Sequence, residues 1–274
     1  MIGPRHAARS LLDANLRLRL EQFADRDWLA SAMIIAPHPD DETLGCGGIA
    51  IKKIAAGAPT SFVFVTDGAA SHHGRIEPEK LRALRETEAR EAVRHLGASP
   101  DSITFLRYPD AQANAHTEAI AADISRLLRR FRPESVFVPH AKDPPSDHGA
   151  VNVAVRLALR EFGCPVTVYE YPVWYWYHWP WVRLHGDLPG MWRTTTRQTL
   201  RTRGGLRALS ALNRQAYVGD VLERKRAALA AHVTQMRRPE GDPGWTTLAD
   251  LAGGDLIRRL TADYEAFCRY EVNA

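Results

Sequence analysis

Three short apolar runs, each followed by a stretch with helical periodicity, constrain the fold of this chain most strongly. They are Ala32–Ala36, Ser61–Thr66 and Ser135–Val138, and they contain almost no charged or strongly polar side chains. A strand that is apolar along its whole length is buried on both faces, which is typical of a parallel sheet covered by helices. The order of these runs therefore predicts an α/β fold in which helices cover both faces of a mainly parallel sheet.

The remaining pattern extends this prediction to a Rossmann-like three-layer sandwich. We expect one domain over residues 1–274, with a core over 30–170 and a helical, aromatic-rich C-terminal extension over 171–274 on the substrate side. Helices are predicted over residues 10–29, 43–56, 79–96, 118–131, 150–162, 212–236 and 255–270, and further strands over 103–106 and 166–169. In such a sheet, ligands bind beyond the carboxyl ends of the strands.

Composition excludes several classes of protein. The 274 residues have 45% hydrophobic content and a net charge of +4, with basic and acidic residues interspersed, so a nucleic-acid-binding role is not indicated. The stretch from Arg193 to Arg214 lacks acidic residues and could attract an anionic substrate or membrane surface, although a solvated loop is the simpler interpretation. The three cysteines lie far apart, which argues against a disulfide framework, and the sequence shows neither a transmembrane run nor a secretory signal. We therefore expect a cytoplasmic protein. Homo-oligomerisation is left open by the sequence.

The segment from Pro37 to Glu42 directly follows the first apolar strand and reads Pro-His-Pro-Asp-Asp-Glu. One histidine and three acids at this edge of the sheet are energetically costly unless a cation is bound. A divalent metal relieves the repulsion between Asp40 and Asp41, because one carboxylate ligates while its neighbour stays free as a base for water. The alternative, an N-cap for the next helix, accounts for only one of the acids.

A second polar segment runs from His140 to His148, just past the strand Ser135–Val138. Taken alone, it is explained by Asp147 capping a helix beside an exposed His148. We expect the parallel sheet to bring this segment close to the first one. His148 is then a candidate for the third metal ligand, and Asp147 is a candidate for orienting a ligating histidine. Two imidazoles and one carboxylate leave a position open for water, as in catalytic zinc sites.

These segments resemble the LmbE/PIG-L superfamily of N-acetylglucosaminyl deacetylases, whose signature is matched by Ala36-Pro37-His38-Pro39-Asp40-Asp41-Glu42. Other family motifs follow in the family's order. They are Gly45-Cys46-Gly47-Gly48, Thr66-Asp67-Gly68, Arg85-Glu86-x-Glu88, Tyr108-Pro109-Asp110, Asp147-His148 and Lys225-x-x-Ala-Leu-x-x-His232-x-x-Gln235. The resemblance covers residues 30–165 and the region 225–235, and this ordered series is far more specific than a single motif.

The resemblance implies hydrolysis of an N-acetyl group from an amino-sugar-containing small molecule or glycoconjugate, releasing acetate and a free amine. It implies zinc, with ferrous iron as an alternative, bound by three of the residues above. The implied roles are His38, Asp41 and His148 as ligands, Asp40 as general base, and Arg85 and Asp110 as sugar contacts. From the residues alone, Arg85 could instead pair with an acid on its own helix, and Asp110 could be a turn residue.

One departure from the family pattern affects proton transfer. Many family members have a histidine where this chain has Pro145, and that histidine is thought to stabilise or protonate the intermediate. Proline has no side-chain donor. The replacement candidates are His140, His232, and His72 or His73, each of which is also explained as an ordinary surface or core residue.

Two questions remain open in the sequence. The sequence leaves two alternative functions. One is a zinc amidohydrolase that acts on a non-sugar amide, and the other is a sugar-binding protein whose catalysis has lapsed. The aromatic block 174–181 is interpreted mainly as packing for the C-terminal part, with one or two rings at the rim of the pocket.

Overall fold

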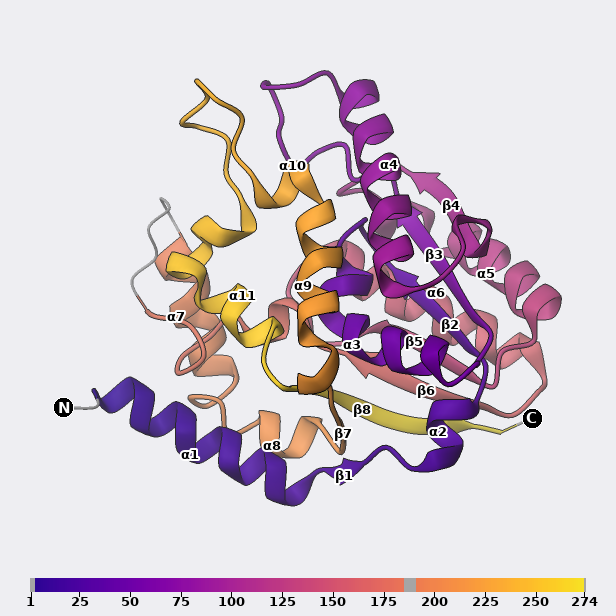
Figure 1. The fold of residues 1–274 in the computed structure, drawn as a ribbon, viewed down its shortest axis with the longest axis horizontal. Helices are drawn as coiled ribbons and strands as arrows, with labels where there is room; N and C mark the ends of the chain where they lie inside the picture. The colour runs from indigo at the N-terminus through magenta and orange to yellow at the C-terminus, as the bar shows by residue number, and fades with distance from the viewer. Residues whose placement is uncertain (1–2, 185–190, 274) are drawn as a thin grey trace.

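The computed structural model describes residues 3–184 and 191–273, which form an eight-stranded sheet flanked by helices (Figure 1). The strand order is β1-β7-β8-β6-β5-β2-β3-β4. The strands span β1 Glu21–Gln22, β2 Ala32–Ala36, β3 Thr60–Thr66, β4 Ile103–Tyr108, β5 Ser135–Pro139, β6 Val166–Tyr171, β7 Arg214–Tyr217 and β8 Tyr264–Val272. β4, β3, β2, β5 and β6 are mutually parallel, which confirms the predicted α/β fold with a mainly parallel sheet.

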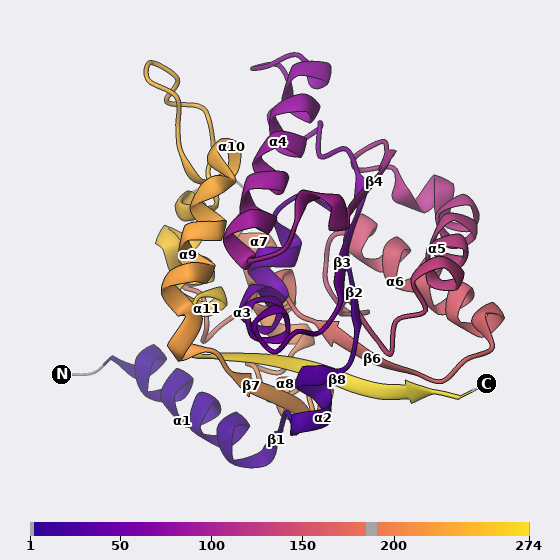
Figure 2. The ribbon, with the colours of Figure 1, turned by 45° about the vertical axis from the view of Figure 1, so that its right-hand side comes forward.

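Helices cover both faces of the parallel strands. Their bounds are α1 Pro4–Arg19, α2 Asp25–Leu29, α3 Asp41–Ala55, α4 Pro78–Leu96, α5 Thr117–Phe131, α6 Ser146–Phe162, α7 Met191–Arg201, α8 Ala208–Ala211, α9 Leu222–Ala231, α10 Val233–Met236 and α11 Asp255–Leu260. Figure 2 shows α5 and α6 on one side of β2 and β3, and α3, α4 and α9 on the other.

The β2 strand shows why an uninterrupted apolar run was needed. Met33 and Ile35 pack in the core beneath α5 and α6, whereas Ile34 and Ala36 pack in the core on the α3 side. Because side chains alternate along a strand, a strand between two helical layers must be apolar at every position. The predicted elements between residues 30 and 170 are confirmed, with boundaries that differ by a few residues.

The predicted helix over 212–236 is wrong, because this region contains β7, α9 and α10. The break between the last two helices falls at His232, whose backbone is not helical (φ −77°, ψ 63°). The predicted helix over 255–270 is also wrong beyond Leu260, because residues 264–272 form β8, antiparallel to both β6 and β7. The free edge of β6 supplies hydrogen-bonding partners that the local periodicity does not encode.

The N-terminal prediction of one helix over 10–29 is correct only in part. The chain leaves α1 after Arg19 and pairs Glu21 and Gln22 with β7 before α2 begins at Asp25. The C-terminal extension is therefore not only helical, since it adds β7 and β8 to the sheet.

The aromatic block mostly packs, as expected. Tyr175, Trp176, Tyr177 and Trp181 are buried within the core on the α3 side of the sheet. Trp174 alone of this block lines the pocket described below. Within residues 3–184 and 191–273, no helix combines the length and apolar character needed to cross a bilayer.

Candidate active site and metal centre

A cavity of about 180 Å³ lies where several parallel strands end. Five loops contribute to it, those after β2, β3, β4, β5 and β6, and the C-terminal part of the chain completes its wall. The lining residues are His38, Asp40, Asp41, Leu44, Ser71, Arg85, Asp110, Pro145, Trp174, Gln235 and Leu248. This position agrees with the rule that open parallel sheets bind ligands beyond the carboxyl ends of their strands.

The structure brings His38, Asp41 and His148 together as predicted. His38 lies in the loop after β2, Asp41 begins α3, and His148 lies in the first turn of α6. Asp41 Oδ2 lies 3.1 Å from His38 Nδ1 and 3.2 Å from His148 Nε2, and one donor atom from each residue lies within 4.8 Å of the others. Donors that share a tetrahedral zinc ion lie about 3.4 Å apart, given bonds near 2.1 Å. His148 Nε2 is buried, and its contact with Asp41 Oδ2 is its one polar contact that the described residues show. These residues therefore fit a divalent metal ion.

The outer nitrogen of each histidine faces a carboxylate. His148 Nδ1 lies 3.0 Å from Asp143 Oδ2, and His38 Nε2 lies 3.1 Å from Asp110 Oδ1. Such contacts fix the ring orientation and the tautomer of a metal-binding histidine, and they raise its basicity. Asp147 contributes a longer contact of 3.4 Å to His38, rather than one to its neighbour His148.

Asp143 is the residue of the candidate site that sequence reasoning missed. Its carboxylate also accepts hydrogen bonds from the backbone N–H groups of Val173, Trp174 and Tyr175. It therefore ties the loop after β6 to His148, a candidate metal ligand. The available signal was a carboxylate five residues before His148, within the polar segment that follows β5.

Electrostatics within this cluster favour charged side chains. Burial alone would lower the pKa of His148, but the charge of Asp41 and the hydrogen bond to Asp143 raise that pKa to about 9. Burial would raise the pKa of Asp41, but the charge of His148 and hydrogen bonds from His148 and His38 hold it well below its usual value. Burial would likewise raise the pKa of Asp110, but His38 lowers it to about 2. A cluster with two adjacent imidazoles and several carboxylates is suited to bind a cation.

Asp40 lies next to the three candidate metal ligands but is held by different contacts. Its backbone has φ 145°, an unfavourable conformation for a residue other than glycine. Arg85 Nη2 lies 3.2 Å from Asp40 Oδ2. Burial raises the pKa of Asp40 to about 6, and the charge of Arg85 opposes this rise. A carboxyl group with a pKa near neutrality is suited to accept and return a proton.

Arg85 is anchored in the pocket wall by backbone carbonyls as well as by Asp40. It donates to the carbonyl of Gly68 at 3.0 Å and to that of Pro39 at 2.5 Å. Gly68 has φ 65°, and a Cβ at this position would lie 2.7 Å from Arg85 Nη1, so the turn requires glycine. The alternative of an ion pair with Glu88 or Glu86 on the same helix is wrong, because Glu86 pairs with Arg107 and Glu88 accepts hydrogen bonds from Thr234.

Glu42 explains the third acid of the first motif. Its carboxylate accepts the backbone N–H of Asp40 at 2.9 Å and the hydroxyl of Thr43 at 2.6 Å. His232 Nε2 lies 2.9 Å from the same carboxylate, and both side chains are fully buried. Burial would lower the pKa of His232, but the charge of Glu42 raises it. His232 thus lies behind the loop that contains Asp40, outside the pocket lining.

The other histidines considered as proton donors also lie outside this lining, among the described residues. His140 packs against Tyr175 and accepts a hydrogen bond from the backbone N–H of Lys142. His73 is exposed on the loop after β3. Pro145 itself lines the pocket, so the position that contains histidine in many family members presents no donor here.

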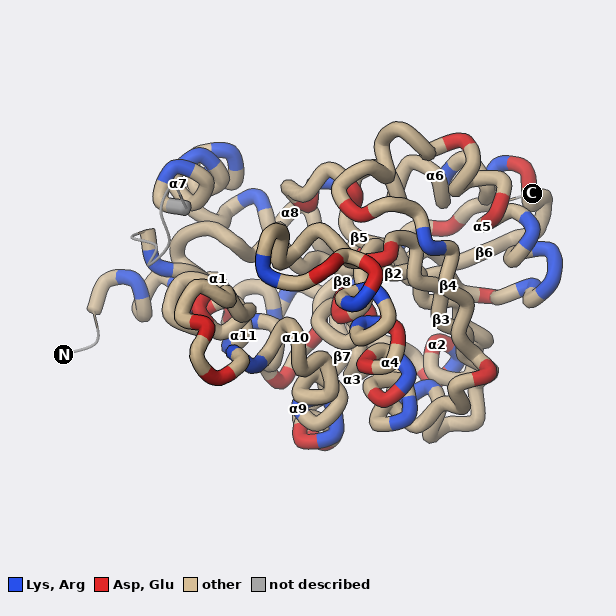
Figure 3. Tube along the Cα trace, turned by 90° about the horizontal axis from the view of Figure 1, so that it is seen from above, with Lys and Arg blue, Asp and Glu red and all other residues tan. Residues whose placement is uncertain are grey.

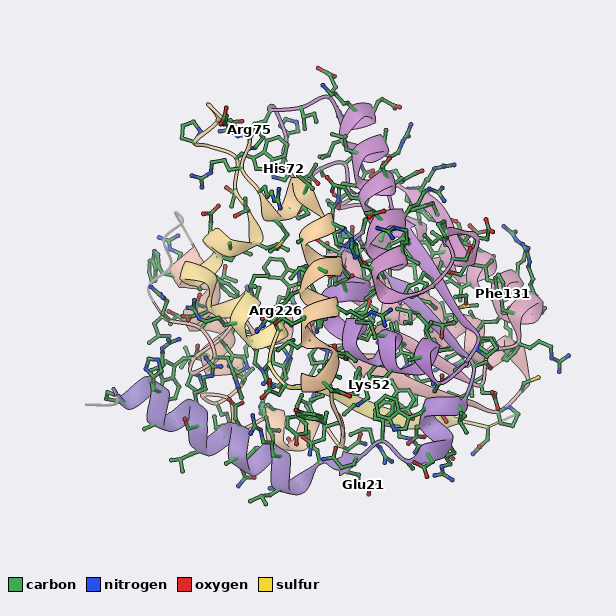
Figure 4. The ribbon with its side chains drawn as sticks, viewed as in Figure 1. Glu21, Lys52, His72, Arg75, Phe131 and Arg226 are labelled. Carbon is green, nitrogen blue, oxygen red and sulfur yellow. The ribbon has the colours of Figure 1, made fainter. Side chains whose placement is uncertain are left out.

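The loop after β3 is joined to the segment before α11 above the pocket. His72 stacks on Trp245 and contacts the carbonyl oxygen of Thr246, while Arg75 pairs with Asp242. Figure 4 labels His72 and Arg75. These contacts fix the wall that includes Ser71 and Leu248. They also explain the buried state of His72, whose pKa is lowered by burial.

Comparison with known proteins identifies a family profile over residues 33–159, described as PIG-L: GlcNAc-PI de-N-acetylase. The diacetylchitobiose deacetylase of Thermococcus kodakarensis is 27% identical over 129 residues, which are 47% of this chain and 46% of that protein. The match thus spans about half the length of this curated relative. An uncharacterized deacetylase of Escherichia coli K12, YaiS, is 26% identical over 52% of this chain and 77% of its own length.

Among solved structures, the N,N'-diacetylchitobiose deacetylase of Pyrococcus horikoshii has the same fold. It was determined with an inhibitor bound, and its TM-score to this chain is 0.63 at 19% identity. The alignment covers 98% of this chain and 94% of the other. The similarity therefore extends beyond the residues matched by the family profile to the C-terminal strands and helices.

Proposed function

We propose, from the premise that residues 33–159 form a domain of the PIG-L family, that this chain hydrolyses an N-acetyl group on an amino-sugar-containing substrate. The observation that supports this most strongly is the arrangement of His38, Asp41 and His148 around one point, with Asp40 beside them in the pocket lining. The similarity to the diacetylchitobiose deacetylase of Thermococcus kodakarensis supports N-acetylated sugars as the substrate class.

We infer that the metal is zinc, bound by His38, Asp41 and His148. Two imidazoles and one carboxylate form a ligand set known from catalytic zinc sites, in which one coordination position stays available. Zinc bound there would supply Lewis acidity for the acetyl carbonyl and lower the pKa of a water molecule toward neutrality.

Asp40 is the proposed general base and also the acid in this reaction. Its carboxylate removes a proton from the attacking water, and the tetrahedral intermediate then expels the amine, which receives that proton. No histidine other than His38 lines the pocket within the described residues, so Asp40 is the group in place for both steps. Its pKa of about 6, raised by burial, suits this role. Arg85 orients the carboxylate and neutralises its charge.

The substrate would enter between an apolar and a polar wall. Trp174 and Leu248 offer surfaces against which a sugar ring packs, while Ser71 and Gln235 offer hydroxyl and amide groups for sugar hydroxyls. Gln235 Nε2 lies 3.4 Å from Ser71 Oγ. Asp110 is bound to His38 and to the backbone N–H of Ala70, so its contribution to sugar binding is secondary to its support of His38.

The test is acetate release by metal-stripped protein, with and without added zinc. The substrate panel includes N-acetylglucosamine, diacetylchitobiose, nucleotide-linked and lipid-linked N-acetyl sugars, and N-acetyl amino acids. Zinc-restored release from sugars supports the proposal, whereas release only from N-acetyl amino acids would replace it with a non-sugar amidohydrolase. Stoichiometric zinc binding without any release would indicate a sugar-binding protein whose catalysis has lapsed.

A further inference from the structure

The helix α7 buries polar side chains and exposes two large apolar ones among its exposed arginines and threonines. Thr195 and Gln198 point inward, with 0% and 6% exposure, whereas Trp192 and Leu200 are 53% and 75% exposed. Polar contacts fix the inner face, for example the hydrogen bond of 3.0 Å from the backbone N–H of Trp179 to Thr199 Oγ1. Because a surface helix normally buries its large apolar side chains, the exposed Trp192 and Leu200 are available to contact an apolar partner.

The exposed face of α7 is also strongly basic. Arg193, Arg197 and Arg201 follow one another at four-residue spacing, so they form a row beside Trp192 and Leu200. The pattern continues in the turn after the helix, where Arg203, Arg207 and Leu206 are exposed, the leucine by 58%. No Asp or Glu occurs between residues 191 and 219. Figure 3 shows this basic run at the periphery of the molecule.

We propose that this face, the α7 basic–apolar face, binds the surface of an anionic lipid bilayer. Arginines pair with acidic headgroups, tryptophan prefers the interfacial region, and leucines enter the acyl boundary. A second copy of the chain fits less well, because a two-fold contact would place two sets of arginines against each other. Nucleic acid would leave the exposed leucines without a role. The inference is independent of the proposed hydrolysis.

The charge contribution is tested by co-sedimentation with vesicles of phosphatidylcholine, with and without phosphatidylserine. Wild-type protein should partition onto the anionic vesicles, and added salt should weaken this binding. Arg193→Glu/Arg197→Glu should reduce the partition coefficient about tenfold or more. The matched control is Arg156→Glu/Arg160→Glu, which makes the same change in charge at exposed positions on α6 and should reduce binding much less.

The apolar contribution is tested with Leu200→Ser, which should weaken binding several-fold. Its control is Val153→Ser, because Val153 is 50% exposed on α6. Thermal unfolding of each variant checks that the fold is kept. The proposal is overturned if wild-type protein does not bind anionic vesicles, or if the α6 variants lose as much binding as the α7 variants. It is also overturned if Leu200→Ser abolishes a concentration-dependent dimer without changing vesicle binding.

Discussion

The substitution Asp143→Asn tests two roles of one carboxylate, which contacts the candidate metal ligand His148 and anchors the loop after β6. The carboxylate accepts from His148 Nδ1 and from three backbone N–H groups, with the shortest contact, 2.7 Å, from Tyr175 to Oδ1. The asparagine keeps the most hydrogen bonds if its NH₂ group faces Tyr175, because its oxygen then still accepts from the other three donors. This leaves one buried N–H unpaired, which should lower the free energy of unfolding of the metal-free protein by about 1–3 kcal/mol.

The neutral amide should also weaken zinc binding. A carboxylate behind a metal-binding histidine typically contributes about 10–100-fold to metal affinity, which corresponds to about 1.4–2.7 kcal/mol. Competition with a chromophoric chelator measures zinc affinity, and urea unfolding of the stripped protein measures stability. Asp123→Asn, at a partly exposed position on α5, serves as the control. Zinc affinity within threefold of wild type, together with reduced stability, would refute a role for Asp143 in tuning the metal site.

Three further predictions follow from the contacts around the pocket. Asp40→Asn should retain its full metal content but lose about 10²–10⁴-fold in turnover; a near-normal rate would exclude Asp40 as the base. His232→Ala should lower the free energy of unfolding by about 3 kcal/mol, because the buried carboxylate of Glu42 loses its cationic partner and keeps only the neutral donors of Asp40 and Thr43. An equal loss in His232→Gln would argue against a contribution from this hydrogen bond. Burial lowers the pKa of His178 to about 4. The unfolded chain therefore protonates His178 at a higher pH than the folded protein does. The free energy of unfolding should fall by up to about 3 kcal/mol as the pH drops from 6.5 to 4. His178→Phe should flatten this part of the curve measured by chemical unfolding, and an unchanged slope would contradict the assignment.

Local periodicity predicted the core well because each element there buries a regular face. The segments between β2 and β6 are apolar at every position or at helical spacing, so neighbours in sequence suffice to define them. Residues 264–272 show where this reasoning ends. The pattern of apolar residues predicted that the helix of α11 continues through this segment. In the structure the segment instead pairs with the edge of β6 as a strand. The buried ion pair of 2.7 Å between Lys225 and Glu265 joins this strand to α9.

The sequence by itself determined the family resemblance, the parallel core and the residues available to bind a metal. Those features depend on residue type and spacing, which are local properties, and the family match over residues 33–159 confirms the resemblance. Only the tertiary structure decided how these residues support one another. Asp143 reaches His148, Asp110 reaches His38, and His232 reaches Glu42 across 190 positions of the chain. Such contacts depend on side-chain direction and on which loops converge at the sheet edge, and no local pattern encodes either of these.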